Sequence, residues 1–262
     1  MSLVVSELTV STSDGMPLVR GLSFELAPGR RLGLIGESGS GKSLTALAVT
    51  GLLAPGLGAT GSVKLAGTEV IGADERTLVT LRGRRAAIVF QDPLTALDPL
   101  MRIGAQLREP LRRHQGLRGA ALKQAVLDGL SEVSLPDPGR IASSYPHEIS
   151  GGQRQRVAIA LALACRPDLL IADEPTTALD VTVQAEVLDV LDRLAAERAM
   201  ALLFISHDLA VVARMTDQVM VMRQGEAVES GSLTTILAAP AHPYTAELVR
   251  SAQSLDAALE LS

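Results

Sequence analysis

A glycine-rich stretch near the N-terminus constrains this chain more than any other feature. Residues 36–43 read Gly-Glu-Ser-Gly-Ser-Gly-Lys-Ser and fit the pattern G-x-x-x-x-G-K-[ST]. The apolar run 32–35 precedes this stretch, and the apolar run 44–49 follows it as a candidate helix. Because glycine tolerates positive φ angles, such a turn can direct successive backbone N–H groups at one anion beside the positive end of the helix. The stretch predicts a phosphate-binding loop built from Gly36, Ser38, Gly39, Ser40, Gly41, Lys42 and Ser43.

The same pattern predicts the ligands of the loop, ATP and Mg²⁺. Lys42 would reach the β- and γ-phosphates, and the Ser43 hydroxyl would coordinate Mg²⁺. A second motif lies at 169–174, where four apolar residues are followed by Asp173 and Glu174. A carboxylate at the end of a buried strand is the Walker B arrangement, so we expect Asp173 to hold the Mg²⁺ shell. We expect Glu174 to polarise the water that attacks the γ-phosphate.

Composition restricts the classes of function. Aromatic residues make up 2% of the chain, the formal net charge is −5 and the pI is near 5.4, so nucleic acid is not expected as a partner. The single cysteine, Cys165, indicates a reducing compartment, with the cytoplasm as the default. Residues 1–10 contain no basic segment typical of a signal peptide. The longest apolar run, 157–165, is about half of a membrane span, so we expect any membrane role to depend on partners.

The distribution of patterns predicts an α/β fold. Residues 3–26 alternate as an antiparallel pair around an Asp14-Gly15 turn, and residues 61–67 resemble a short edge strand. Helical periodicity dominates 92–165, and strands and helices alternate from 168 onwards, which favours a parallel sheet. We therefore predict three parts: 1–91 as the first part of an ATP-binding core, 92–165 as an inserted helical subdomain, and 166–262 as the rest of the core with a short C-terminal tail.

With these motifs in place, the chain resembles the ATP-binding subunits of ABC transporters over nearly its whole length. Ile149-Ser150-Gly151-Gly152-Gln153 is similar to the signature motif, with isoleucine where leucine is usual. Ser150 can cap a helix whose first amides would bind a γ-phosphate, which the resemblance assigns to the nucleotide of a second subunit. Gln91 resembles the Q-loop glutamine that senses Mg²⁺ or the attacking water. Ala178-Leu179-Asp180 resembles the D-loop, and His207 resembles the switch histidine.

The resemblance also implies partners and a location. A cassette of this family works as a head-to-tail dimer with a second, homologous ATPase subunit, and the dimer drives two transmembrane permease subunits. A solute-binding protein outside the cytoplasm is an indirect partner. The expected location is therefore the cytoplasmic face of the cell membrane, as a peripheral subunit. The resemblance implies ATP hydrolysis coupled to transport, with Glu174, His207 and Gln91 as the catalytic residues.

Three further segments narrow the resemblance to one branch. Residues 90–99, 144–148 and 241–245 are similar to the oligopeptide, dipeptide and nickel importers. The chain lacks a cysteine-containing C-terminal extension, so no iron–sulfur site is expected and the shorter nickel-type members become a close comparison. Import of peptides, or of nickel or a metal chelate, stays open. A soluble ABC-type ATPase that acts on nucleic acid or ribosomes is the alternative from another class.

The nucleotide base poses a separate question. The family usually stacks adenine on an aromatic residue of the N-terminal strands, but the segment 4–19 contains no aromatic residue. Phe24 alternates with apolar neighbours and is expected to face the core. We therefore expect Val10 or Val19 to cover the base, with little preference for ATP over GTP.

Overall fold

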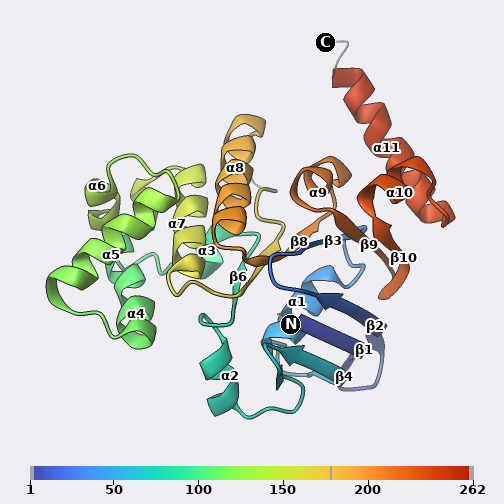
Figure 1. The fold of residues 1–262 in the computed structure, drawn as a ribbon, viewed down its shortest axis with the longest axis horizontal. Coiled ribbons are helices and arrows are strands. Elements are labelled where there is room, and N and C mark those ends of the chain that lie inside the picture. The colour runs from blue at the N-terminus through green and yellow to red at the C-terminus, as the bar shows by residue number, and fades with distance from the viewer. Residues whose placement is uncertain (1–2, 178, 260–262) are drawn as a thin grey trace. The chain divides into compact units, whose positions relative to one another are not determined.

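A computed structural model describes residues 3–177 and 179–259, with the side chains of that part up to residue 253. The chain divides into two compact units, Met1–Asp74 with Ala201–Ser262, and Glu75–Met200. The helical subdomain expected at 92–165 lies within the second unit. Figure 1 shows the elements of both units.

The first unit contains a small antiparallel sheet with the strand order β2-β1-β4-β5. Its strands are β1 (Leu3–Thr12), β2 (Pro17–Leu26), β4 (Leu57–Leu65) and β5 (Thr68–Glu69). The predicted turn joins β1 to β2, where Gly15 has a φ of 85° and its N–H donates to the Thr12 carbonyl. The expectation of a short edge strand at 61–67 was wrong. The strand β4 is longer and lies between β1 and β5, because Thr68 and Glu69 fold back on its end.

The first unit also contains three parallel strands, of which β3 is the central one. The order is β10-β9-β3-β8, and only β10 runs antiparallel to its neighbour. The elements are β3 (Arg31–Ile35), α1 (Lys42–Thr50), β8 (Ala201–Ser206), α9 (Leu209–Met215), β9 (Gln218–Arg223), β10 (Glu226–Ser232), α10 (Leu233–Ala238) and α11 (Pro243–Leu259). Helix α9 packs closely on β3, since a Cβ atom at Gly33 would lie 2.4 Å from Val212 Cγ1. The residues of β8 are all buried, which fits the apolar run 201–205 that precedes Ser206.

The second unit combines two parallel strands with a group of helices. Its elements are α2 (Glu75–Leu81), β6 (Ala86–Val89), α3 (Pro93–Ala96), α4 (Ile103–Gln115), α5 (Gly119–Glu132), α6 (Pro138–Ser143), the 3₁₀ turn η1 (Pro146–Glu148), α7 (Gly151–Leu163), β7 (Leu169–Asp173) and α8 (Val181–Glu197). Strands β6 and β7 pair in parallel with Val89 opposite Ala172. Every residue of β7 is buried, including Asp173.

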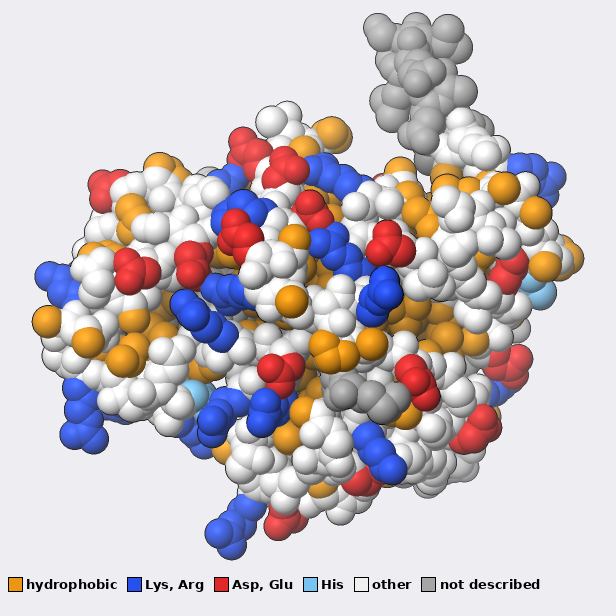
Figure 2. All heavy atoms as spheres, in the orientation of Figure 1, with side chains coloured by type: hydrophobic (Ala, Val, Ile, Leu, Met, Phe, Trp, Pro, Cys, Tyr) orange, Lys and Arg blue, Asp and Glu red, His pale blue; other side chains and the backbone are white. Residues whose placement is uncertain are grey.

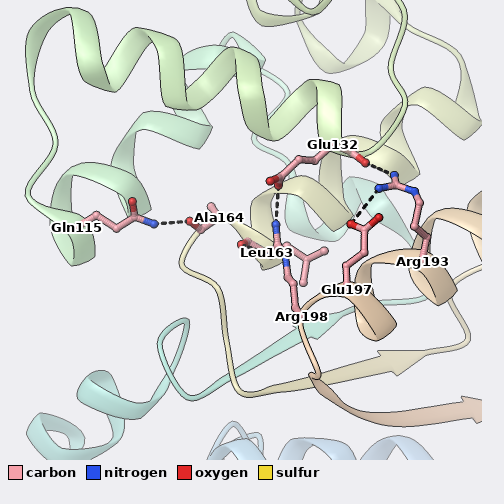
Figure 3. Close-up of polar contacts among 7 residues, drawn as sticks. All are labelled: Gln115, Glu132, Leu163, Ala164, Arg193, Glu197 and Arg198. Carbon is pink, nitrogen blue, oxygen red and sulfur yellow. Dashed lines mark hydrogen bonds and ion pairs between the residues drawn. The ribbon is translucent and has the colours of Figure 1, made fainter. Parts of the chain in front are cut away.

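Polar contacts tie α8 to the helices α5 and α7, as Figure 3 shows. The Arg198 guanidinium donates to the Glu132 carboxylate at 2.5 Å and to the Leu163 carbonyl at 3.2 Å. Arg193 of α8 donates to the main-chain carbonyl of Glu132, so the C-terminal end of α5 is held by Arg193 and by Arg198, the residue that follows α8. These contacts close the ends of α5 and α7, whose last carbonyls lack helical partners.

The core is aliphatic, as the composition predicts, and Phe204 is a fully buried aromatic side chain within it. On the face seen in Figure 2, acidic and basic side chains are interspersed. Among the described residues, no helix is long and apolar enough to cross a bilayer.

Candidate nucleotide-binding site

The glycine-rich stretch follows β3 and leads into α1, as predicted. Ile35, the last residue of β3, lies between Ser206 of β8 and Val221 of β9 in the strand register. The carboxyl ends of three parallel strands therefore meet where the loop begins, which is the usual ligand edge of an open α/β sheet. Gly36 has no room for a side chain, because a Cβ atom there would lie 2.1 Å from the Met222 carbonyl oxygen. Gly41 caps α1 with a φ of 100°.

Lys42 lies inside the loop. Its side chain is buried, and Nζ donates to the carbonyls of Gly36 at 2.7 Å and Glu37 at 2.9 Å. A third contact joins Nζ to Ser40 Oγ at 3.4 Å. The ammonium group is therefore enclosed by atoms of the loop itself. Ser43, in the first turn of α1, is exposed and accessible to an ion.

Two C-terminal residues also contact the loop, and the sequence reasoning assigned neither of them to it. The Gly225 N–H donates to the Ser40 carbonyl at 3.1 Å, and the Glu37 N–H donates to the Tyr244 hydroxyl at 2.9 Å. The motif at 241–245 was a signal for Tyr244, but it indicated only the branch of the family. The loop is thus held by residues about 200 positions away in the chain.

His207 follows β8 and precedes α9 within the same unit as the loop. It is exposed, at the strand end next to β3. Asp208 caps α9 by accepting from the Ala210 N–H at 2.9 Å, and its own N–H donates to Ser206 Oγ at 3.0 Å. The bond between Asp208 and Ser206 joins the residues on either side of His207, and the bond to Ala210 orders the start of α9. The structure therefore brings the predicted histidine to the sheet edge where the phosphate loop starts.

In the second unit, the structure brings Gln91 and Glu174 together. Strands β6 and β7 end side by side, and Gln91 Nε2 lies 3.4 Å from Glu174 Oε2. The Thr177 hydroxyl donates to the same carboxylate oxygen at 3.0 Å. Glu174 has a φ of 48°, a left-handed conformation that costs a non-glycine residue about 1–2 kcal/mol. Sequence reasoning missed Thr177, because its role depends on this turn of the backbone.

The signature-like segment begins α7 with reciprocal caps. Ser150 Oγ accepts from the Gln153 N–H at 3.3 Å, and Gln153 Oε1 accepts from the Ser150 N–H at 3.1 Å. Ile149 is buried and so anchors the segment. The predicted cap at Ser150 is confirmed. Gly151 and Gly152 provide the first two amides of the helix, which have no helical carbonyl to bind.

The start of α8 lies against the start of α7. Asp180 caps α8 by accepting from the Val183 N–H at 3.0 Å. A Cβ atom at Gly152 would lie 2.3 Å from Val183 Cγ1, so glycine permits this close approach. The D-loop-like and signature-like segments are therefore neighbours within one subunit. Ala178 of the predicted D-loop lies outside the described residues.

The expectation for the nucleotide base was wrong. Val10 and Val19 are partners across β1 and β2, and both are 0% exposed, so neither offers a surface to adenine. Val19 instead packs under the loop, since a Cβ atom at Gly41 would lie 3.0 Å from Val19 Cγ2. Phe24 is 9% exposed and faces the core as predicted.

The residues present suit a Mg–nucleotide complex better than a metal ion alone. The described residues contain no group of three or more histidine, cysteine, aspartate or glutamate side chains that could hold a metal. Mg²⁺ is usually bound by one or two carboxylates together with the phosphates of the substrate. Each unit by itself offers oxygen donors of that kind: the first has the hydroxyl of Ser43, and the second has the amide of Gln91 and the carboxylate of Asp173.

Comparisons with known proteins identify the family of the chain. The family model described as ABC transporter matches residues 19–177. The oligopeptide transport ATP-binding protein OppD of Salmonella typhimurium is 46% identical over 250 residues, which is 95% of this chain and 75% of that protein. The glutathione import ATP-binding protein GsiA of Escherichia coli is 46% identical over 249 residues, which is 91% of this chain and 40% of GsiA.

Solved structures give the same result. The dimeric ATP-binding cassette MJ0796, in a post-hydrolysis state bound to ADP and Pi, has a TM-score of 0.78 and 26% identity, covering 88% of this chain and 98% of that one. The structure of cbiO1 from Clostridium perfringens, part of the transporter complex cbiONQ, has a TM-score of 0.78 and covers 91% of each chain. The chain therefore belongs to the ABC transporter family and is an ATP-binding cassette of that family.

Proposed function

We propose that this cassette hydrolyses ATP to power the import of peptides through a membrane complex. It would act at the cytoplasmic face of the membrane with a second, homologous ATPase subunit and two permeases, and a solute-binding protein would deliver the cargo. The observation that carries the hydrolytic role is the contact of Gln91 with Glu174 at the ends of two parallel strands. The likeness to dimeric cassettes supports the proposed dimer.

In this proposal the phosphate loop binds the β- and γ-phosphates. Lys42 would exchange its bonds to the carbonyls of Gly36 and Glu37 for phosphate oxygens, and the buried site would strengthen that attraction. Ser43, Gln91 and Asp173 are the residues that would hold Mg²⁺. When bound, the ion would neutralise charge that develops on the phosphates.

Glu174 would act as the base that polarises the attacking water. Thr177 donates to Oε2 of this carboxylate at 3.0 Å and would hold the carboxylate in place for that role. Gln91 donates to the same Oε2 and would thereby fix the plane of the carboxylate. His207 would complete the site by a hydrogen bond to the γ-phosphate.

The start of α7 would bind the nucleotide held by the partner subunit. Ser150 Oγ already accepts from Gln153, which leaves the amides of Gly151 and Gly152 as helix-end donors. Asp180, at the neighbouring start of α8, would contribute to binding the same nucleotide.

We also propose that residues 92–165 form the helical subdomain that inserts between 1–91 and 166–262.

Peptide is the cargo that the comparisons favour over nickel. OppD of Salmonella typhimurium is an oligopeptide transport protein by name, and GsiA imports glutathione, which is itself a tripeptide. Residues 90–99, 144–148 and 241–245 fit both cargoes, so they do not discriminate between peptide and nickel.

Uptake measurements test the proposal. A strain that lacks the gene for this chain should lose uptake of a radiolabelled tripeptide and keep uptake of ⁶³Ni²⁺. Wild-type protein should restore the peptide uptake, and the Glu174→Gln variant should not. Loss of nickel uptake with intact peptide uptake would overturn the assignment of cargo. Co-purification of nucleic acid in place of permeases would overturn the transport role.

A further inference from the structure

The segment 241–245 forms the start of α11 and is fixed at several points. The Glu229 carboxylate accepts from the N–H groups of Ala241 at 2.8 Å and His242 at 3.0 Å. His242 Nδ1 accepts from the Tyr244 N–H at 3.2 Å, so the histidine caps the helix whose first residue is Pro243. These bonds orient the first turn of α11, and none of them involves the phosphate loop.

Tyr244 projects from this turn into the interior of the first unit. Its side chain is 2% exposed, and the Arg223 guanidinium lies 4.8 Å from the centre of its ring. The hydroxyl accepts from the Glu37 N–H at 2.9 Å. Burial, the largest influence, raises the pKa of the Tyr244 phenol, so the hydroxyl is neutral at physiological pH. A neutral hydroxyl can accept this bond without adding a negative charge beside the phosphates.

Glu37 is the point at which this contact acts on the loop. Its N–H is bound by Tyr244, and its carbonyl accepts from Lys42 Nζ at 2.9 Å. The two peptide groups that flank its Cα are therefore each held by a side chain. Farther along the loop, the Gly225 N–H fixes the Ser40 carbonyl. The C-terminal part of the chain thus holds the loop at two points, Glu37 and Ser40, and neither contact uses the amides of Gly39 or Gly41.

We propose that Tyr244 is a positioning residue for nucleotide binding, which holds the phosphate loop in its binding conformation through the Glu37 N–H. The inference rests on the proposed role of residues 36–43 in binding nucleotide. A loop that is ordered before the ligand arrives loses less conformational entropy on binding, and its affinity rises accordingly. The branch-specific segment at 241–245 would then serve the nucleotide site directly.

The test removes the hydroxyl alone. Tyr244→Phe keeps the ring, its packing and its contact with Arg223, but leaves the Glu37 N–H without its acceptor. We expect the dissociation constants of MgATP and ADP, measured with fluorescent analogues, to rise together by about five- to tenfold. The thermal midpoint should change little. Binding of both nucleotides within twofold of wild type would overturn the proposal, as would a large loss of stability with unchanged affinity.

A double-mutant cycle tests the route through Glu37. Glu37→Pro removes the same N–H, and Glu37 has no positive φ that would exclude proline. If Tyr244 acts through this N–H, Tyr244→Phe should have no further effect in the Glu37→Pro background. Additive effects would place the action of Tyr244 elsewhere and overturn the proposal.

Hydrogen exchange of the Glu37 amide is a second measurement, and it does not require the proline variant. In the nucleotide-free protein, the Glu37 amide of Tyr244→Phe should exchange at least about tenfold faster than in wild type. Unchanged protection would contradict the inference.

The Lys42→Ala variant separates a wrong assignment of the phosphate loop from a wrong assignment of Tyr244. If Lys42→Ala also leaves ADP affinity intact, the assignment of the loop has failed. If only Tyr244→Phe leaves it intact, the assignment of the tyrosine has failed.

Discussion

Replacing Glu174 by glutamine should stop hydrolysis without disturbing the fold. Glutamine has the same length, and its carbonyl oxygen can still accept from Thr177 Oγ1 and Gln91 Nε2, which lie 3.0 and 3.4 Å from the glutamate oxygen. Both contacts are therefore preserved, and the free energy of unfolding should change by less than about 0.5 kcal/mol. What is lost is the charge that would polarise the attacking water.

The size of the effect follows from the role of a general base. Such a group typically contributes about 10²- to 10⁴-fold, or about 3–5 kcal/mol of the activation free energy. Phosphate release by the assembled transporter at saturating MgATP should fall by that factor, while equilibrium ATP binding stays near wild type. The variant should then accumulate as an ATP-bound dimer, visible as an earlier peak in size-exclusion chromatography.

Thr177→Val is the matched control for this experiment. It removes the donor that orients the carboxylate but keeps the base, so a loss of about 1 kcal/mol, or roughly fivefold in rate, is expected. The reasoning is refuted if Glu174→Gln keeps more than a tenth of the turnover. It is also refuted if Thr177→Val is as inactive as Glu174→Gln, because the hydroxyl would then matter as much as the base that it is expected only to orient.

Four other results are expected. Gly36→Ala should destabilise the protein by about 3 kcal/mol or more, seen as a lower thermal midpoint, because its Cβ would lie 2.1 Å from a backbone oxygen that cannot easily move. Ser150→Arg should leave ATP binding by the isolated subunit intact but abolish turnover in the dimer; loss of binding by the monomer would show a purely structural role. Competition titrations should give less than about a tenfold preference for ATP over GTP, since no aromatic residue stands in segment 4–19, and a larger ratio would mean that another group binds the base. Finally, the pKa of Glu229 lies below its ordinary value: burial works to raise it, but hydrogen bonds, chiefly from the Ala241 amide, outweigh this. A depressed folded-state pKa contributes stability that is fully present above the unfolded pKa of about 4.3 and is lost as the pH falls through the folded-state pKa below it. Protection of the α11 amides should therefore hold from pH 6 to about 5 and fall below about pH 4, and Glu229→Gln should lose this dependence.

Features that depend on neighbouring residues could be predicted from the sequence. The spacing of Gly36, Gly41 and Lys42 specifies a turn and the start of a helix, because the positive φ angles and the helix end are local properties. The cap at Ser150 needs only the residue three positions later. The strand before Asp173 was recognisable because its apolar run is too short for a helix and alternates with helical segments. The resemblance to ABC transporter subunits rests on the same local motifs.

Features that depend on distant residues were decided by the tertiary structure. Val10 and Val19 are buried because β1 pairs with β2 in a register that turns both side chains inward, and an alternating pattern alone does not say which of its two faces is covered. Strand β4 became internal because β5 folds back on its end. The bond between Glu37 and Tyr244 spans 207 positions, and no local pattern encodes it. The sequence alone determined the glycine spacing and the helix start of residues 36–43, because these are local properties, whereas only the tertiary structure decided that Gly225 and Tyr244 hold this loop, because they lie far from it in the chain.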